Sequence, residues 1–275
     1  HRPNPPEIQQ QQASALPCEK RIYTDGAWND PNVDARAAKE MPEAGYGAVE
    51  FQVTQPDRPT IGEAFPLGQY TTSGFDDSAG HGVITWVDAG MVETEHSEPD
   101  YIGAEAHTNN TGELTAMHRA LRRAASAPAG RERTRIESDS LYTIHMTTGK
   151  WLPRKRRNRE IISRLRGMWR DIQRKRPGEV SLRHVRSHIL VPGNELADEL
   201  ADGRGSNWNS THSARRWMRE FMRKLHDGSH GGQVTNGVTT ETDNAAALTG
   251  NNQADDSQPS GPQGPGTLGD RVGVG

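Results

Sequence analysis

The order of strand-like and helix-like segments between residues 21 and 201 constrains the fold of this chain most. Residues 21–28 alternate with the period of a strand, and residues 45–53 have the composition of a second one. Further along the chain, helix-like segments alternate with strand-like ones. The expected helices are 110–125, 141–146, 160–174, 194–201 and 208–225, and the expected later strands are 83–87, 101–107, 134–139 and 180–185. This order predicts an α/β fold in which helices cover the faces of a mixed sheet.

The two ends of the chain differ in composition from its middle. Residues 1–17 contain four consecutive glutamines and four prolines, and no aromatic residue follows Phe221. Such segments bury too little apolar surface to offset the entropy lost on ordering. We therefore expect a disordered tail at 1–19, a folded domain at 20–205, a basic helix at 206–226 and a second disordered tail at 227–275.

Positive charge is concentrated in one segment of the chain. Residues 150–186 hold fourteen lysines and arginines against three acids, a net of +11, although the whole chain has a formal net charge of −3. A polyanion approaching this segment would meet its local field rather than the average charge. A solvated helix face or a nuclear-import patch is the alternative interpretation.

Cysteine content and hydropathy exclude several classes of protein. Cys18 is the only cysteine, so an intrachain disulfide and a cysteine-based zinc site are both excluded. No apolar run reaches the ~18 residues that span a bilayer, and no signal segment opens the chain. We expect an intracellular protein without a membrane partner, in the nucleus or the cytoplasm. Because the chain begins with His1, we also expect a fragment of a longer protein.

Four carboxylates stand at the ends of expected strands or at the starts of expected helices. Asp25 lies in Tyr-Thr-Asp-Gly on the first strand, and Glu113 follows Asn-Asn-Thr-Gly at a helix start. Asp139 lies in Ser-Asp-Ser after a strand, and Asp198 follows His188 by ten residues. Singly, each acid is more typical of a turn, a cap or a favourable first-turn charge. Their order and contexts together favour a shared site.

In this order, the motifs resemble those of the type I ribonuclease H family over residues 21–205. The resemblance implies a ribonuclease H-like fold, with a five-stranded mixed sheet flanked by helices. It also implies a hydrolase that cleaves, as an endonuclease, the RNA strand of an RNA/DNA hybrid. Two Mg²⁺ ions roughly 3.5–4 Å apart can activate the water and stabilise the departing oxygen in such a reaction.

The resemblance also implies roles for the site residues. Asp25, Glu113 and Asp139 would bridge or bind two Mg²⁺ ions, for which Mn²⁺ could substitute, and Asp198 would complete one metal site. His188 would lie on a mobile loop beside the scissile phosphate and assist proton transfer or product release. A histidine beside Pro-Gly can also be a simple surface residue.

Other residues are candidates for contact with nucleic acid. Asn109 and Asn110 carry donors and acceptors that can read 2′-hydroxyls, and they can equally cap the helix; the two roles can coexist. Trp151 resembles the aromatic residue that lies along the DNA strand in family members, with a core tryptophan as the alternative. The remaining expected contacts are Thr108, Thr148, Lys150 and Arg154.

The chain departs from the family pattern in three places. Asp25 and Glu113 are 88 residues apart, so we expect an insertion at about 54–100. Its scattered polar residues are more typical of a loop than of a metal site; they are His81, Asp88, His96 and Glu98. Leu141 stands where many members place a polar hybrid contact. The extra helix and basic loop of some cellular enzymes have no clear counterpart.

Two other functions are alternatives to the ribonuclease. A non-catalytic nucleic-acid-binding module of the same fold has no reason to concentrate negative charge where phosphate must lie. A DNA-cutting integrase or transposase is the second alternative, and the asparagine pair together with the spacing from His188 to Asp198 favours the ribonuclease over it. We expect an origin in a retroelement or a reverse-transcribing polyprotein, with an upstream partner such as a reverse transcriptase, or a truncated cellular enzyme. The sequence predicts no particular oligomeric state.

Overall fold

The structure is a computed structural model that describes residues 18–28, 43–55, 61–153, 157–203 and 210–228. The chain divides into two compact units, His1–Asp227 and Gly228–Gly275, and every element below belongs to the first. Nearly all of the two expected tails lies outside the described residues. Cys18 and Glu19, which we assigned to the first tail, are instead the first residues of a strand.

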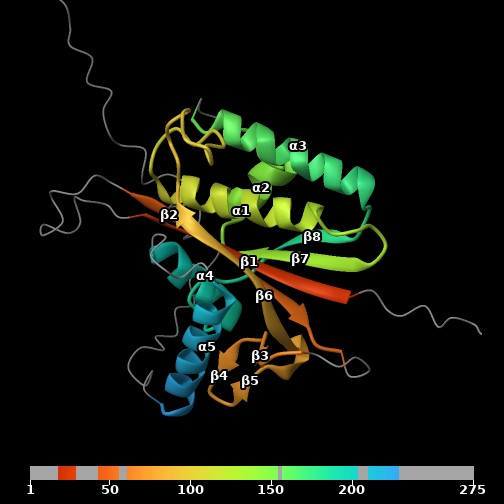
Figure 1. Cartoon of the computed structure of the whole chain (residues 1–275), viewed down its shortest axis with the longest axis vertical. Coiled ribbons are helices and arrows are strands. Elements are labelled where there is room, and N and C mark those ends of the chain that lie inside the picture. Colours follow the sequence, from red (N-terminus) through yellow and green to blue (C-terminus); the bar gives the residue numbers. More distant parts are fainter. Residues whose placement is uncertain (1–17, 29–42, 56–60, 154–156, 204–209, 229–275) are drawn as a thin grey trace, which may run out of the picture. The chain divides into compact units, whose positions relative to one another are not determined.

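A mixed sheet of six strands forms the centre of the first unit (Figure 1). In spatial order the strands are β3 (Ala64–Pro66), β6 (His81–Met91), β2 (Ala44–Val53), β1 (Cys18–Trp28), β7 (Glu132–Ser138) and β8 (Val180–His184). The pairs from β3 to β1 are antiparallel, whereas β7 is parallel to β1 and β8 is parallel to β7. The five longer strands form the expected mixed sheet, and β3 adds three residues at its edge.

Within the described ranges, five α-helices cover the two faces of the sheet (Figure 1). One face carries α1 (Asn109–Ala125), α2 (Leu141–Thr148) and α3 (Arg159–Lys175), and the other carries α4 (Pro192–Asp202) and α5 (Thr211–His226). Successive side chains of β1 point to opposite faces of the sheet, and each face has its own hydrophobic core. Ile22 belongs to the cluster with Leu114 of α1, whereas Tyr23 belongs to the cluster with Leu196 of α4.

The prediction of a strand at 101–107 is wrong. These residues form an irregular segment in which Ile102 and Ala104 are buried. Gly103 has a φ of 97°, and a Cβ at this position would collide with Glu160 and Ile161 of α3. A glycine in a conformation that other residues rarely adopt breaks the extended backbone here.

The region that we expected as an insertion contributes to the central sheet. Its strand β6 pairs with β2 from Gly45 to Val53, well beyond the expected strand at 83–87. The rest of this region includes β3, a short hairpin of β4 (Tyr70–Thr71) and β5 (Gly74–Phe75), and a 3₁₀ turn at Asp77–Ala79. None of its polar residues lies in a three-residue cluster of metal-ligating groups within the part of the chain that the structure describes.

The last expected helix is present as α5. Ser210 caps it, because its side chain accepts a hydrogen bond from Ser213 N at 3.1 Å. Its buried face packs on β6 and α4, and consists of Ala214, Met218, Phe221 and Leu225. Among the described helices, none is long and apolar enough to cross a membrane.

Candidate active site

Two glycines allow Asp25 and Glu113 to meet. A Cβ at Gly26 of β1 would collide with the backbone of Gly112 and Glu113, and a Cβ at Gly112 would collide with Gly45 O. The absence of both side chains lets the first turn of α1 lie directly against β1. Glu113 is thereby brought beside the buried carboxylate of Asp25.

Asp139 completes a group of three carboxylates. It follows the last residue of β7, which lies parallel to β1, so the two strands deliver their acids to the same end of the sheet. Oxygen atoms of Asp25, Glu113 and Asp139 all lie within 4.8 Å of one another. The structure thus brings together three of the four acids that the sequence singled out.

Asp198 belongs to a second, adjoining group. On α4, its carboxylate lies within 4.8 Å of a ring nitrogen of His188 and an oxygen of Glu195. Its charge acts on Asp25 and Asp139, which places the two groups beside each other. We did not predict Glu195. Its position one helical turn before Asp198 was the available signal, because residues three apart share a helix face.

Burial and mutual repulsion both act on the carboxylates. Burial raises the pKa of Asp25 well above its ordinary value, and the charges of Asp139 and Asp198 raise it further. The pKa of Glu113 is raised well above its usual range by burial and then by the charge of Asp25. Burial also raises the pKa of Asp139, while a hydrogen bond with the Asn194 side chain works in the opposite direction. Ionisation of these clustered carboxylates is therefore unfavourable unless positive charge is bound near them.

A divalent cation fits this site. The donors of the first group are all carboxylate oxygens, the ligand type that Mg²⁺ and Mn²⁺ prefer. Glu113 Oε2 is buried and has no hydrogen-bond partner among the described residues. A buried oxygen without a donor is costly, and a bound cation would satisfy it.

Comparison with known proteins identifies the family. The family model "RNase H" matches residues 74–205. A ribonuclease H from Saccharopolyspora erythraea is 34% identical over 113 residues, which cover 38% of this chain and 70% of that relative. The chain belongs to the ribonuclease H family. It is accordingly a ribonuclease H-type hydrolase.

Two solved ribonucleases H are similar in structure. RNase H1 from the halophilic archaeon Halobacterium salinarum is 20% identical, covers 68% of this chain and 96% of its own, and has a TM-score of 0.39. LC11-RNase H1 in complex with an RNA/DNA hybrid is 15% identical. The match covers 67% of this chain and 97% of that one, with a TM-score of 0.37.

The asparagine pair of this ribonuclease H lies in the first turn of α1. Thr108, rather than either asparagine, caps the helix: its side chain accepts from Thr111 N, while Thr111 Oγ1 accepts from Thr108 N at 2.9 Å. Asn109 and Asn110 are both exposed. Their amides are therefore open to a ligand, three and four residues before Glu113.

The expected nucleic-acid contacts at the end of α2 differ in how far they are exposed. Thr148 is partly buried, and its hydroxyl donates to Ile144 O at 2.9 Å. Lys150 is exposed, whereas Trp151 is half-buried against the core under α1, with its ring 4.6 Å from that of His145. Trp151 is thus partly a core residue. Arg154 lies outside the described residues.

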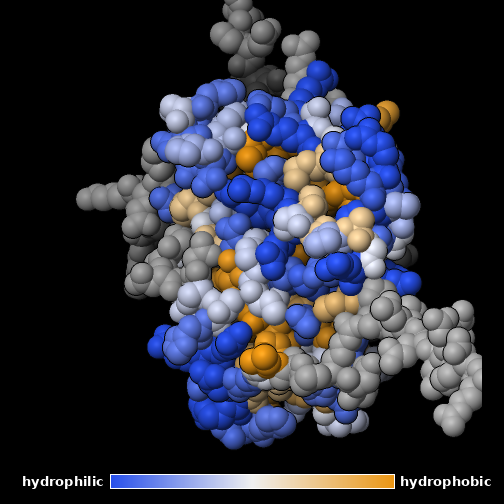
Figure 2. Space-filling model, turned by 45° about the vertical axis from the view of Figure 1, so that its right-hand side comes forward, coloured by the Kyte–Doolittle hydropathy of each residue, from blue (hydrophilic) through white to orange (hydrophobic). Residues whose placement is uncertain are grey.

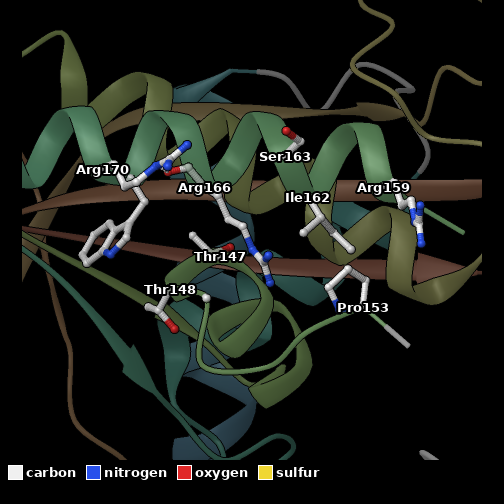
Figure 3. Close-up of a pocket in the computed structure, with 10 residues that line it drawn as sticks. Thr147, Thr148, Pro153, Arg159, Ile162, Ser163, Arg166 and Arg170 are labelled. Carbon is white, nitrogen blue, oxygen red and sulfur yellow. Dashed lines mark hydrogen bonds between the residues drawn. The ribbon is translucent and has the colours of Figure 1, made fainter. Parts of the chain in front are cut away.

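A hollow of about 410 Å³ lies between the end of α2 and residues 159–170 of α3 (Figure 3). Arg159 and Arg170 of α3 stand at its two ends, and Arg166 points from α3 toward the end of α2. Arg166 has a structural task, because it donates to Met146 O and Trp151 O. In the basic segment, Arg166 therefore stabilises the fold, whereas Arg159 and Arg170 leave their charge exposed.

The face shown in Figure 2 is largely hydrophilic, and apolar residues show on it only in small groups. Ile61 and Leu152 are the exposed large apolar side chains among the described residues. This surface suits a charged ligand better than an apolar one.

Proposed function

We propose that this protein is a metal-dependent endoribonuclease that hydrolyses the RNA strand of RNA/DNA hybrids. The observation that carries the proposal is the convergence of Asp25, Glu113 and Asp139 within 4.8 Å, with Asp198 adjoining them. Two divalent cations at the scissile phosphate can activate the attacking water and stabilise the departing oxygen, and this desolvated cluster is suited to hold them.

The site residues divide the work in this proposal. Asp25, Glu113 and Asp139 hold divalent cations, Mg²⁺ or Mn²⁺, and Asp198 completes the metal site. The bound ions would supply an activated water and would offset charge on the phosphate. His188 is exposed beside Asp198, where its ring nitrogen can hold or pass on a proton.

Asn109 and Asn110 supply the preference for RNA. The 2′-hydroxyl is the group that separates an RNA strand from a DNA strand, and it both donates and accepts hydrogen bonds. The exposed amides of this pair stand at the N-terminus of the helix that carries Glu113. A strand read by the pair would consequently be the one presented to the carboxylates.

The DNA strand follows the basic side of the molecule in this proposal. Lys150, Arg159 and Arg170 offer positive charge to its phosphates, and the half-buried Trp151 offers a ring edge. Thr108, Thr148 and Arg154 are the other proposed contacts. LC11-RNase H1, a structural relative, has an RNA/DNA hybrid bound.

One assay tests the proposal against its alternatives. The full chain with Mg²⁺ is given labelled RNA/DNA hybrid, duplex RNA and duplex DNA. We expect cleavage of the RNA strand of the hybrid and loss of cleavage in Asp139→Asn. Asp171→Asn is the matched control, because Asp171 is an exposed acid on α3.

Each other outcome has a distinct meaning. Binding of the hybrid without cleavage by the unmodified protein would indicate a non-catalytic module. Cleavage of duplex DNA would indicate an integrase-type nuclease. An Asp139→Asn variant that cuts as fast as the parent would refute the metal-site assignment.

A further inference from the structure

The loop between β8 and α4 has an unusual backbone. His188 has a φ of 54° and Leu190 a φ of 59°, two of the three positive values among described residues other than glycine. Side chains disfavour this left-handed region, most of all bulky ones such as leucine. Such a conformation persists only when surrounding contacts hold it, and it is often found at functional sites.

Contacts from both sides hold Leu190 in place. Its N–H donates to Glu195 Oε1 at 3.0 Å, and its carbonyl accepts from Tyr70 N at 3.0 Å. Glu195 lies in the first turn of α4, whereas Tyr70 lies in β4, 120 residues earlier in the chain. The family resemblance implied a mobile loop here, but a residue whose N–H and carbonyl are both hydrogen-bonded is restrained.

The hairpin that carries Tyr70 is itself anchored. The Tyr70 hydroxyl donates to Leu225 O of α5 at 3.3 Å, and the Tyr70 ring packs against Phe75 at 4.9 Å. At the base of the hairpin, Leu67 N donates to Gly80 O at 2.9 Å. Figure 1 shows β4 and β5 beside the end of α5. The hairpin is therefore held in a fixed place, and it can in turn restrain the loop that it contacts.

We propose that the β4–β5 hairpin positions His188. Through the bond from Tyr70 N to Leu190 O, it holds the loop so that the His188 ring lies within 4.8 Å of the Glu195 and Asp198 carboxylates. Tyr70 and Glu195 are positioning residues in this scheme. The catalytic part of the inference rests on the proposed function, because it assigns His188 to hybrid cleavage.

Two substitutions of Tyr70 isolate the hydrogen bond. Tyr70→Pro removes the backbone donor together with the ring, whereas Tyr70→Ala removes the ring and keeps the donor. The difference between the two variants therefore reports the N–H group together with the fixed φ of proline. Adding Leu190→Asn to Tyr70→Pro should restore part of the loss, because asparagine tolerates the left-handed region better than leucine.

Amide hydrogen exchange measures the restraint without any activity. In the full chain, we expect residues 186–191 to exchange about fivefold faster in Tyr70→Pro than in Tyr70→Ala, the change expected from one backbone hydrogen bond. Equal exchange in the two folded variants would overturn the proposal. If Tyr70→Pro does not fold, Glu195→Leu against Glu195→Gln makes the same comparison from the other side of Leu190.

Kinetics test the link to His188. We expect Tyr70→Pro to have a kcat about fivefold below that of Tyr70→Ala with the same KM for the hybrid. In a His188→Ala background, this difference should vanish, since the hairpin acts through the histidine. A difference that persists there would show a general structural effect and would overturn the positioning role.

The two proposals fail in different ways. A parent protein that does not cut the hybrid would refute the proposed function, and the catalytic role of the hairpin with it. The exchange result would still decide whether the hairpin restrains the loop. Normal cleavage by the parent, with equal kcat in the two Tyr70 variants, would refute the hairpin proposal alone.

Discussion

At the scale of single residues, the site depends on carboxylates that the protein keeps in an unfavourable place. Glu113 is buried, one of its oxygens lacks a hydrogen-bond donor among the described residues, and the neighbouring charge of Asp25 opposes its ionisation. Functional sites of this kind often lower the stability of the fold. The metal-free protein should therefore become more stable when one of these charges is removed.

Glu113→Gln tests that expectation. An acid whose pKa is raised on folding binds more protons in the native state, so its contribution to stability falls as pH rises. In the presence of a chelator we expect Glu113→Gln to be more stable than the parent at pH 7 by about 1 kcal/mol or more. The advantage should shrink as pH is lowered toward about 4.3, the ordinary pKa of glutamate. Urea unfolding across this pH range measures it.

Glu50→Gln is the matched control for this experiment. Glu50 is also buried, and burial acts to raise its pKa, but hydrogen bonds from Arg123 and Thr85 hold that pKa below its ordinary value. Its replacement should destabilise the protein at pH 7, by about 1–3 kcal/mol. Destabilisation by both substitutions would contradict the assignment of strain to Glu113.

Asp198→Asn tests the second carboxylate group. Asp198 lies beside His188 and Glu195, whereas the next residue, Glu199, is in neither of the two groups of potential metal ligands among the described residues. We expect the Asp198→Asn substitution to lower metal affinity or cleavage on the order of 10–100-fold. Glu199→Gln should leave both near the parent level. Calorimetric titration with Mn²⁺ and the cleavage rate are the measurements, and equal effects of the two substitutions would contradict the assignment.

At the scale of elements, the close crossing of β1 and α1 builds the site. A Cβ added at Gly26 would collide with backbone atoms of Gly112 and Glu113, which cannot move without shifting α1. The same principle applies to Gly47, where a Cβ would meet the backbone of α4. Small residues thus set how near each acid-bearing helix can approach the sheet.

Gly26→Ala should separate α1 from β1. We expect a loss of about 1–3 kcal/mol in the free energy of unfolding and weaker metal binding, because Glu113 moves away from Asp25. Gly167→Ala is the control: Gly167 lies in α3 with open space at its Cβ position, and alanine there should stabilise the helix by up to about 1 kcal/mol. Tolerance of Gly26→Ala at full stability would contradict the crossing geometry.

Local patterns predicted much of this architecture. The helices, the five longer strands and the four acids each have a recognisable local sequence. Glu195 and the hairpin at Tyr70 do not, because contacts with Leu190 from distant parts of the chain define their places. The strand expected at 101–107 failed for a related reason: Gly103 adopts a backbone conformation that its packing against α3 requires.

At the scale of the whole molecule, charge is divided between the two sides of the sheet. The side of α1, α2 and α3 carries the open arginines around the hollow of Figure 3. Bases on both sides are paired with nearby acids, as Arg219 of α5 is with Glu63 and Arg164 of α3 with Glu160. Among the described residues, Arg159 and Arg170 of α3 form no ion pair, and both border the hollow. A polyanion is consequently expected on the α3 side.

Salt dependence tests this division. Replacing Lys150, Arg159 and Arg170 with glutamine should raise KM for the hybrid, leave kcat near the parent value, and flatten the plot of log affinity against log salt. The slope should fall by up to about 0.9 for each phosphate that the protein no longer neutralises. The same change at Arg216, Arg219 and Lys224 of α5 should have a smaller effect. The reverse order would place the nucleic acid on the other side.

The proposed function requires that the carboxylate group of Asp25, Glu113 and Asp139 cleaves RNA in a hybrid by means of bound divalent cations. The most direct measurement is the rate of RNA-strand cleavage as Mg²⁺ is titrated into chelator-treated full chain, with Asp25→Asn in parallel. We predict no cleavage without metal, a saturable rise for the parent, and little rise for Asp25→Asn. Cleavage of the hybrid without a divalent cation, or equal rates for the two proteins, would contradict the account.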